Sequence, residues 1–104
     1  PVDCRDFSIV TIDVSFISAT RILERVPALL QPQADVVVLV KPQFEAGRHE
    51  IGKKGVVLDP KVQRRVVDEV ATKAYSIGLR RIGMTQSPIT GAQGNYEFFL
   101  HLRK

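Results

Sequence analysis

Three charged residues in this sequence are of the types that acid–base chemistry requires, although they lie far apart along the chain. They are Asp13, Lys41 and Glu97. A lysine amine flanked by carboxylates in a partly dry site can act as a base or position a hydroxyl group. Each of the three stands at one end of an apolar segment. Whether they can meet therefore depends on how those segments are arranged.

The segment before Lys41 has the composition of a buried strand. Residues 36–40 are five consecutive aliphatic residues, four of them β-branched. This run predicts a strand buried on both faces, as in the middle of a parallel sheet. In open α/β sheets, ligands bind beyond the carboxyl ends of the strands. The sequence therefore predicts that Lys41 stands at the edge of the sheet where chemistry takes place.

Two further strands lie next to the carboxylates. Residues 7–12 have apolar side chains at both alternating sets of positions, which predicts a strand at least partly buried on both sides. Asp13 follows that strand directly. Residues 96–102 are rich in aromatic side chains and predict a last strand, with Glu97 near its start.

Helical segments lie between these strands, as is typical of an α/β fold. Ser18 can cap a helix over residues 19–30, in which Pro27 should cause a kink or a break into two short pieces. The next helix has clearer end signals, because Asp59 can cap its first turn and Gly78 suits its C-terminal end.

The connections predict the order of the strands. The helix between residues 7–12 and 36–40 makes these strands parallel neighbours. Residues 79–86 predict another strand, and only the turn-rich loop 87–95 joins it to 96–102, so these two should be antiparallel. The predicted order across the sheet is the first strand, the central strand, the last strand, and then 79–86 at the outer edge.

This topology brings the three charged residues to one rim of the sheet. Asp13 and Lys41 end two parallel strands, and Glu97 begins a strand that runs the other way. We therefore predict a site in which the amine lies near both carboxylates. Solvated strand ends that merely form ion pairs are the alternative that the spacing leaves open.

The segment 42–58 predicts a long, irregular and basic loop. At about 17 residues it exceeds the usual loop length, and such loops are commonly functional or mobile. Its Arg48, Lys53 and Lys54 could contact a phosphate backbone, or the loop could simply be solvated. Residues 47–53 match the first seven positions of a phosphate-binding P-loop. Lys54 replaces the required hydroxyl residue, however, and no helix signal follows, which excludes a nucleoside triphosphatase.

Composition narrows the class of protein further. The 104 residues carry a formal charge of +4, which suits a polyanionic partner. Cys4 is the only cysteine, so no disulfide framework or multi-cysteine metal site is expected, and a reducing, cytoplasmic setting fits. His49 and His101 have no further ligand at metal-binding spacing. No apolar run approaches the roughly 18 residues that would span a membrane.

Several ordered motifs together resemble the haemolysin A/TlyA family, whose members carry an FtsJ-like methyltransferase domain behind a small S4-type RNA-binding domain. The motifs are residues 13–18, 39–48, 55–60, 87–91 and 94–99. The resemblance implies a Rossmann-like fold that uses S-adenosylmethionine. It also implies 2′-O-methylation of a ribose in ribosomal RNA, with the RNA or a ribosomal subunit as partner.

The resemblance also implies roles for individual residues. FtsJ-like enzymes use a Lys-Asp-Lys-Glu tetrad, in which Asp13 is similar to the aspartate, Lys41 to the second lysine and Glu97 to the glutamate. Lys41 would then activate the ribose hydroxyl, while the two carboxylates hold and tune the amine. Asp13, Val14 and Ser15 would border the cofactor, and no metal ion is implied.

The resemblance covers only the second half of the fold, from the fourth strand of the sheet to the C-terminus. The first lysine, the glycine-rich cofactor loop, the acid that binds the cofactor ribose and the S4-type domain have no counterpart in residues 1–104. We therefore expect weak cofactor binding and no catalysis by this chain alone, and an exposed edge at 7–13 that could pair with another copy.

Two alternative functions remain. One is a non-catalytic protein that binds RNA or acts as a haemolysin-type interaction protein, although no amphipathic or spanning membrane segment supports a pore. The other is a methyltransferase that acts on something other than RNA.

Overall fold

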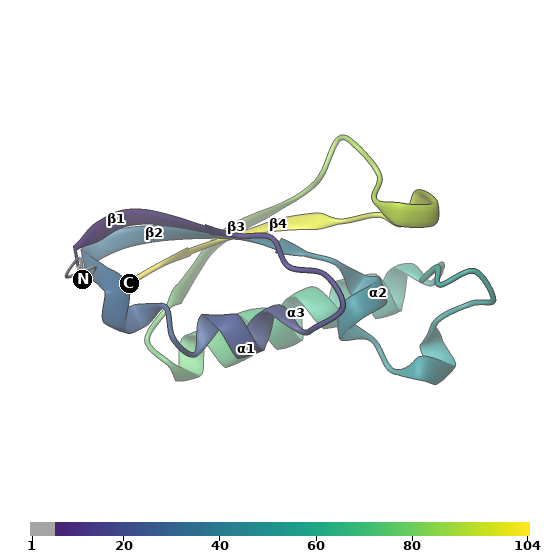
Figure 1. Cartoon of the computed structure of the whole chain (residues 1–104), viewed down its shortest axis with the longest axis horizontal. Coiled ribbons are helices and arrows are strands. Elements are labelled where there is room, and N and C mark those ends of the chain that lie inside the picture. Colours follow the sequence, from purple (N-terminus) through teal and green to yellow (C-terminus); the bar gives the residue numbers. More distant parts are fainter. Residues whose placement is uncertain (1–5) are drawn as a thin grey trace.

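The computed structural model describes residues 6–104, so Cys4 lies outside the described part of the chain. Four strands form one sheet in the order β1-β2-β4-β3 (Figure 1). The strands are β1 (Phe7–Ile12), β2 (Leu30–Val40), β3 (Arg80–Gln86) and β4 (Phe98–Arg103). β1 and β2 are parallel, and β4 is antiparallel to both β2 and β3. The predicted α/β fold and strand order are confirmed.

The three α-helices found in residues 6–104 cover the same face of the sheet (Figure 1). They are α1 (Ala19–Leu23), α2 (Pro42–Glu45) and α3 (Pro60–Ser76), and short 3-10 turns occur at Pro27–Leu29, Arg48–Glu50 and Ala92–Gly94. The core lies between this face and α3. Its fully buried side chains include Val36, Val38, Val40, Val66, Val67, Leu100 and Leu102.

The one-sided cover corrects two predictions, that the central strand is buried on both faces and that the first strand is at least partly buried on both. Along β2, Val38 and Val40 are fully buried, whereas Val37 and Leu39 on the opposite face are only half-buried. In β1, Phe7 is 44% exposed and Ile9 57% exposed. The apolar composition of these strands was identified correctly, but in residues 6–104 no helix covers their second face.

The end signals of the helices were interpreted correctly. The segment after Ser18 breaks as expected, because α1 ends at Leu23 and Pro27 begins a separate 3-10 turn. The Asp59 side chain accepts a hydrogen bond from the Lys61 amide and caps α3. Gly78, just beyond α3, has the left-handed φ of +92° that favours glycine at a helix end.

Three predicted boundaries were wrong. β2 begins at Leu30 instead of residue 36, because the chain returns directly from the turn at Pro27–Leu29 to pair with β1. β4 begins at Phe98, two residues later than predicted. The segment 42–58 is not wholly irregular, since it opens with α2 and contains the 3-10 turn Arg48–Glu50.

The end of segment 42–58 is fixed to the loop before β4 by a buried asparagine. Asn95 is 2% exposed, and its side-chain oxygen accepts a hydrogen bond from the Val57 amide at 2.9 Å. Its amide nitrogen donates to the Gly55 and Ala92 carbonyls, both at 2.9 Å. No helix opens at residues 55–57, which agrees with the exclusion of a P-loop.

Candidate active site

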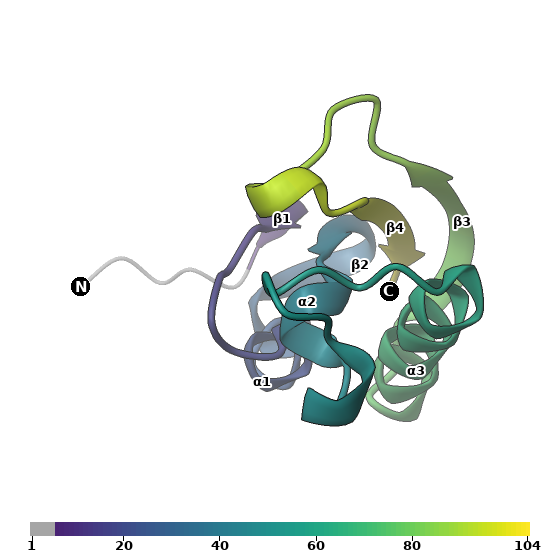
Figure 2. The same ribbon diagram turned by 90° about the vertical axis from the view of Figure 1, so that its right-hand side faces the viewer.

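The three residues predicted to form the site stand at one rim of the sheet. The last ladder pairs at this rim are Ile12 with Val38 and Val40 with Phe98. Asp13 comes directly after the pairing of β1, Lys41 directly after β2, and Glu97 directly before β4. Figure 2 views the molecule from this side, with α2 between the turn that precedes β4 and the segment that follows β1.

The Lys41 amine is held by the segment that follows β1. Its Nζ lies 2.5 Å from Asp13 Oδ1 and donates a hydrogen bond to Ser15 Oγ at 3.0 Å. The Lys41 side chain is only 12% exposed, whereas that of Asp13 is 65% exposed. The amine is thus fixed in a sheltered position, while one carboxylate beside it faces solvent.

Glu97 is held separately from Lys41. It is 9% exposed, and its Oε2 accepts a hydrogen bond from Gln43 Nε2 at 3.1 Å. Its carboxylate also occupies the space that a side chain at position 91 would need, because a Cβ built on Gly91 would lie 2.0 Å from Oε2. No hydrogen bond or ion pair joins Lys41 to Glu97 in the described structure. The rim therefore holds an amine–carboxylate pair and a second carboxylate with its own partner.

Two polar residues at this rim were not identified from the sequence, and both belong to α2. Gln43 donates to Glu97, and Glu45 accepts from Ser18 Oγ at 2.5 Å and from the Ala19 amide at 2.8 Å. Burial raises the pKa of Glu45, although these two hydrogen bonds favour its charged form. Proline after Lys41 is the signal that could have revealed them, because it suits the first turn of a helix and so gives the following residues defined directions.

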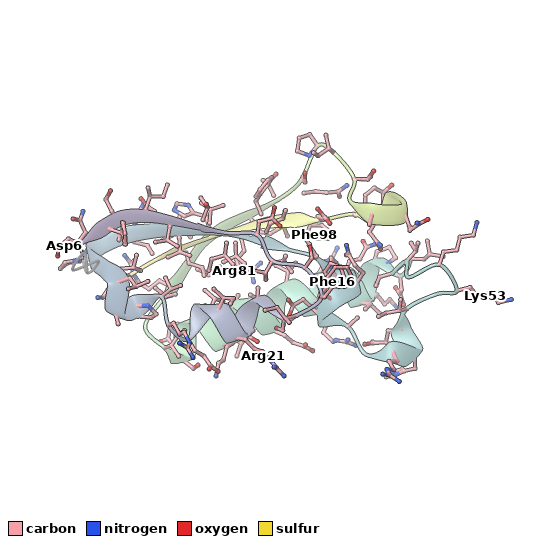
Figure 3. All side chains as sticks on the ribbon, in the orientation of Figure 1. Asp6, Phe16, Arg21, Lys53, Arg81 and Phe98 are labelled. Atoms are coloured by element: carbon pink, nitrogen blue, oxygen red, sulfur yellow. The ribbon has the colours of Figure 1, made fainter. Side chains whose placement is uncertain are left out.

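An exposed aromatic residue was also missed. Phe16 has a left-handed φ of +70° and is 87% exposed. The centroid of its ring lies 5.1 Å from the centroid of the Phe44 ring. The Phe16 side chain points outward near α2 (Figure 3). A bulky residue in this backbone region is strained, and such strain clusters at functional sites. The backbone angle was not visible in the sequence.

The predicted RNA-contacting residues lie in the segment beyond α2. Arg48, Lys53 and Lys54 are all exposed, and Lys53 extends from the far end of the loop (Figure 3). Glu50, in the same segment, is bound by both terminal nitrogens of Arg65 and by the Gly47 amide. These contacts, above all the hydrogen bonds from Arg65, lower the pKa of Glu50 to about 2.

The residues predicted to border a cofactor follow Asp13. Val14 is half-buried and Ser15 is exposed, and the Ser15 hydroxyl already accepts a hydrogen bond from Lys41.

Within residues 6–104, no three histidine, cysteine, aspartate or glutamate side chains are grouped as metal ligands. None of the helices in this part of the chain combines the length and apolar character needed to cross a membrane.

A comparison with known protein families shows which family this chain belongs to. A model of the FtsJ-like methyltransferases matches residues 2–104. The chain belongs to the FtsJ-like methyltransferase family. The resemblance noted from the motifs around Asp13, Lys41 and Glu97 is thereby confirmed.

Named relatives agree with this assignment. The Bacillus subtilis protein YqxC is 52% identical over 92 residues, which cover 88% of this chain and 33% of YqxC. The Mycobacterium tuberculosis 16S/23S rRNA (cytidine-2′-O)-methyltransferase TlyA is 43% identical over 95 residues, which cover 91% of this chain and 35% of TlyA. Hemolysin A of Brachyspira hyodysenteriae is 36% identical, with 90% and 39% covered. The chain thus spans about a third of the length of these FtsJ-like relatives.

Solved structures show the same fold. A crystal structure from Lactococcus lactis that bears the name hemolysin superposes with a TM-score of 0.91 at 43% identity, covering 99% of this chain and 49% of its own. A Catenulisporales acidiphilia 16S rRNA (adenine(1408)-N(1))-methyltransferase, solved with S-adenosylmethionine, matches with a TM-score of 0.51 at 11% identity. The match covers 91% of this chain and 51% of that methyltransferase chain. The second likeness shows a shared methyltransferase fold.

Proposed function

We propose that this chain is the C-terminal half of the methyltransferase domain of a longer cytoplasmic protein, which moves a methyl group from S-adenosylmethionine to a ribose 2′-hydroxyl of ribosomal RNA. The observation that carries the proposal is the sheltered Lys41 amine, held by Asp13 and Ser15 at the same rim as Glu97. Family membership supports the reaction class, and the relative TlyA is named as an rRNA (cytidine-2′-O)-methyltransferase.

In this proposal Lys41 acts on the hydroxyl that is to be methylated. In its unprotonated form, this nitrogen would accept a hydrogen bond from the ribose 2′-hydroxyl and take up the hydroxyl proton as the oxygen bonds to the methyl group that leaves the cofactor sulfur. Asp13 keeps the amine at the rim through the 2.5 Å contact. Glu97 supplies a second carboxylate at the same rim, whose charge would attract the ammonium group that forms on Lys41.

The residues after β1 fit a cationic cofactor. When bound, S-adenosylmethionine supplies an electrophilic methyl group on a positively charged sulfur. Asp13 offers an exposed carboxylate, Val14 a half-buried apolar surface and Ser15 a hydroxyl. A carboxylate beside an apolar surface suits a ligand that is positively charged and has a hydrocarbon part.

The exposed cations beyond α2 are proposed to bind the RNA backbone. Arg48, Lys53 and Lys54 stand in one exposed segment, and phosphate contacts of this kind position a nucleic acid without reading its sequence. We further propose that the exposed ring of Phe16, which follows Asp13 closely, stacks on an unpaired base near the site.

The open face of the sheet is proposed to be covered by the N-terminal half of the methyltransferase domain in the longer protein. Phe7 and Ile9 of the edge strand β1 are exposed, and the relatives are about three times as long as this chain. That half would supply the remaining cofactor contacts, so this chain alone is expected to be inactive. Without it, β1 is free to pair with a second copy.

The test is the transfer of a labelled methyl group from S-adenosylmethionine to ribosomal RNA by the full-length protein. Lys41→Ala should lower transfer by about 10²-fold to 10⁴-fold while the protein keeps its fold. Lys73→Ala is the matched control, since Lys73 pairs with Glu24 on the surface of the helical layer. Unchanged transfer by the Lys41 variant would remove this residue from the mechanism.

The substrate class needs its own test. Cross-linking of RNA to residues 48–54 would support RNA as the substrate, whereas methyl transfer without such cross-links would favour a different acceptor. Binding of RNA without any transfer by the full-length protein would favour a non-catalytic role, which is the alternative suggested by the hemolysin A name of one relative.

A further inference from the structure

The helical turn α2 contacts the two segments that carry Asp13 and Glu97. Lys41 directly precedes it, and Pro42–Glu45 form the turn itself. On one side α2 meets the segment that follows β1, and on the other it meets Glu97 before β4 (Figure 2). The two contacts are made by different residues of the turn, and each can be tested separately.

Glu45 binds the segment that follows β1. Its two carboxylate oxygens accept one hydrogen bond each, from Ser18 Oγ at 2.5 Å and from the Ala19 amide at 2.8 Å. The Phe16 and Phe44 rings add an aromatic contact between the same two segments. The segment that carries Asp13 is therefore held at its far end by Glu45 and at its near end by Lys41.

Gln43 binds Glu97 in an orientation that leaves its own oxygen without a partner. Gln43 and Glu97 are each 9% exposed, and Gln43 Nε2 donates to the carboxylate. Gln43 Oε1 is buried, with no hydrogen-bond partner in the described part of the chain. The reversed amide would place oxygen against a carboxylate oxygen, which is repulsive. A buried acceptor left unpaired is unfavourable, so the contact with Glu97 determines how this amide is oriented.

We propose that Gln43 and Glu45 are positioning residues of the methyl-transfer site. Gln43 orients the Glu97 carboxylate, and Glu45 holds the segment that carries Asp13, so that both acids at the rim are fixed. This inference rests on the proposed function, because it assigns the two residues to the same reaction. Neither touches Lys41 or a substrate in this arrangement, and both act through other residues.

The first experiment is a double-mutant cycle in the full-length protein with Gln43→Leu and Glu97→Gln. Loss of orientation at a reacting centre should lower kcat of Gln43→Leu by about 10-fold to 100-fold, with KM for RNA unchanged. In the Glu97→Gln background, Gln43→Leu should have no further effect on kcat, because the charge that it orients is already absent. An equal loss of kcat in both backgrounds would overturn the proposal, as would an unchanged kcat of the single variant.

The second experiment compares two replacements of Glu45. Glutamine keeps an oxygen that can accept from the Ala19 amide and an NH₂ that can donate to Ser18 Oγ, whereas alanine keeps neither. We expect Glu45→Ala to lower kcat by about 10-fold and Glu45→Gln to restore it close to the wild-type value. Equal loss in both variants would show that the charge matters rather than the hydrogen bonds, and would contradict a positioning role.

Lys41→Ala, measured in the same assay, separates the two hypotheses. If Lys41→Ala retains transfer, the proposed role of Lys41 fails and the positioning role, which depends on it, fails as well. If Lys41→Ala abolishes transfer while Gln43→Leu and Glu45→Ala leave kcat unchanged, the proposed function stands and only the role of α2 is refuted. Circular dichroism and thermal melting of each variant establish that the compared proteins are folded.

Discussion

The ladder between β2 and β4 has charged side chains at both of its ends, and the two groups are built differently. At one end, Asp35 stands directly opposite Arg103, and its Oδ1 accepts from Arg103 Nε at 2.9 Å and from His101 Nε2 at 2.8 Å. At the other end, Lys41 and Glu97 lie one residue beyond the last ladder pair, and each takes its partners from loops or from α2.

The difference shows how a structural cluster and a candidate site can arise on the same pair of strands. Hydrogen bonds from His101, followed by those from Arg103, lower the pKa of Asp35, so this carboxylate is already stabilised by the sheet itself. Asp13, by contrast, is bound by Lys41 but remains 65% exposed. Strand register alone creates the first group, whereas the second depends on segments outside the ladder and leaves charge accessible to a ligand.

The largest expected difference in methyl transfer is between two variants that each change a carboxylate to an amide, one at each end of the β2–β4 ladder. Glu97→Gln in the full-length protein should lower methyl transfer by about 10²-fold or more, because the second negative charge at the rim is lost. Asp35→Asn should leave transfer unchanged and lower the midpoint of urea unfolding, because two donors lose their charged partner. Labelled-methyl assays and urea titrations of both variants measure the contrast. Normal transfer by the Glu97 variant, or reduced transfer by the Asp35 variant, would contradict the assignment of Glu97 to the site and of Asp35 to a structural cluster.

A smaller effect is expected from Gly91→Ala. The new Cβ would lie 2.0 Å from Glu97 Oε2, so the carboxylate must swing away from Gln43. Because the displaced atoms are the end of a flexible side chain, stability should change little, while transfer falls by about 10-fold.

Gly83→Ala is the matched control for that variant, since a Cβ at Gly83 meets no atom within 4 Å. Transfer and thermal melting are measured for both proteins. Loss of transfer in the Gly83 variant to the same extent would show that the sheet as a whole, and not Glu97, is sensitive.

The stability contributed by Asp35 should depend on pH. Its pKa in the folded protein is lowered from the ordinary 3.8, so its contribution is present above about pH 4 and is lost as the pH falls through the lower, folded-state value. The difference in unfolding midpoint between wild type and Asp35→Asn should therefore be largest near neutral pH and close in acid. A difference that stays constant across the titration would contradict the ion-pair explanation.

The smallest effect concerns Glu50 and Arg65, which fix the basic segment to α3. Glu50 has its pKa lowered to about 2, so its contribution is present above the ordinary 4.5 and disappears only as the pH approaches about 2. Glu50→Gln should slightly lower the unfolding midpoint at neutral pH and weaken RNA binding without changing kcat. Glu69→Gln, at the other partner of Arg65, is the control and should leave RNA binding unchanged. A changed kcat in the Glu50 variant would show that the basic segment takes part in the site.

Much of the fold followed from local patterns. Asp59 and Gly78 predicted the ends of α3 correctly, because a capping side chain and a left-handed glycine act within one turn. The strand order also followed, since the lengths of the connections decide which strands can be parallel. The burial of β2 on one face only could not be predicted from the sequence. The apolar residues 36–40 show that both faces of this strand can be buried, but the packing of the other segments determines which face is covered.

The sequence by itself determined that Asp13, Lys41 and Glu97 stand at one rim, because strand direction and connection type specify which ends of strands meet. Only the tertiary structure decided that Lys41 pairs with Asp13 while Glu97 pairs with Gln43, and that Glu45 holds the segment after β1. These contacts join residues 26 to 54 positions apart through loops beyond the ladder. Their geometry depends on how α2 packs, which no local pattern encodes.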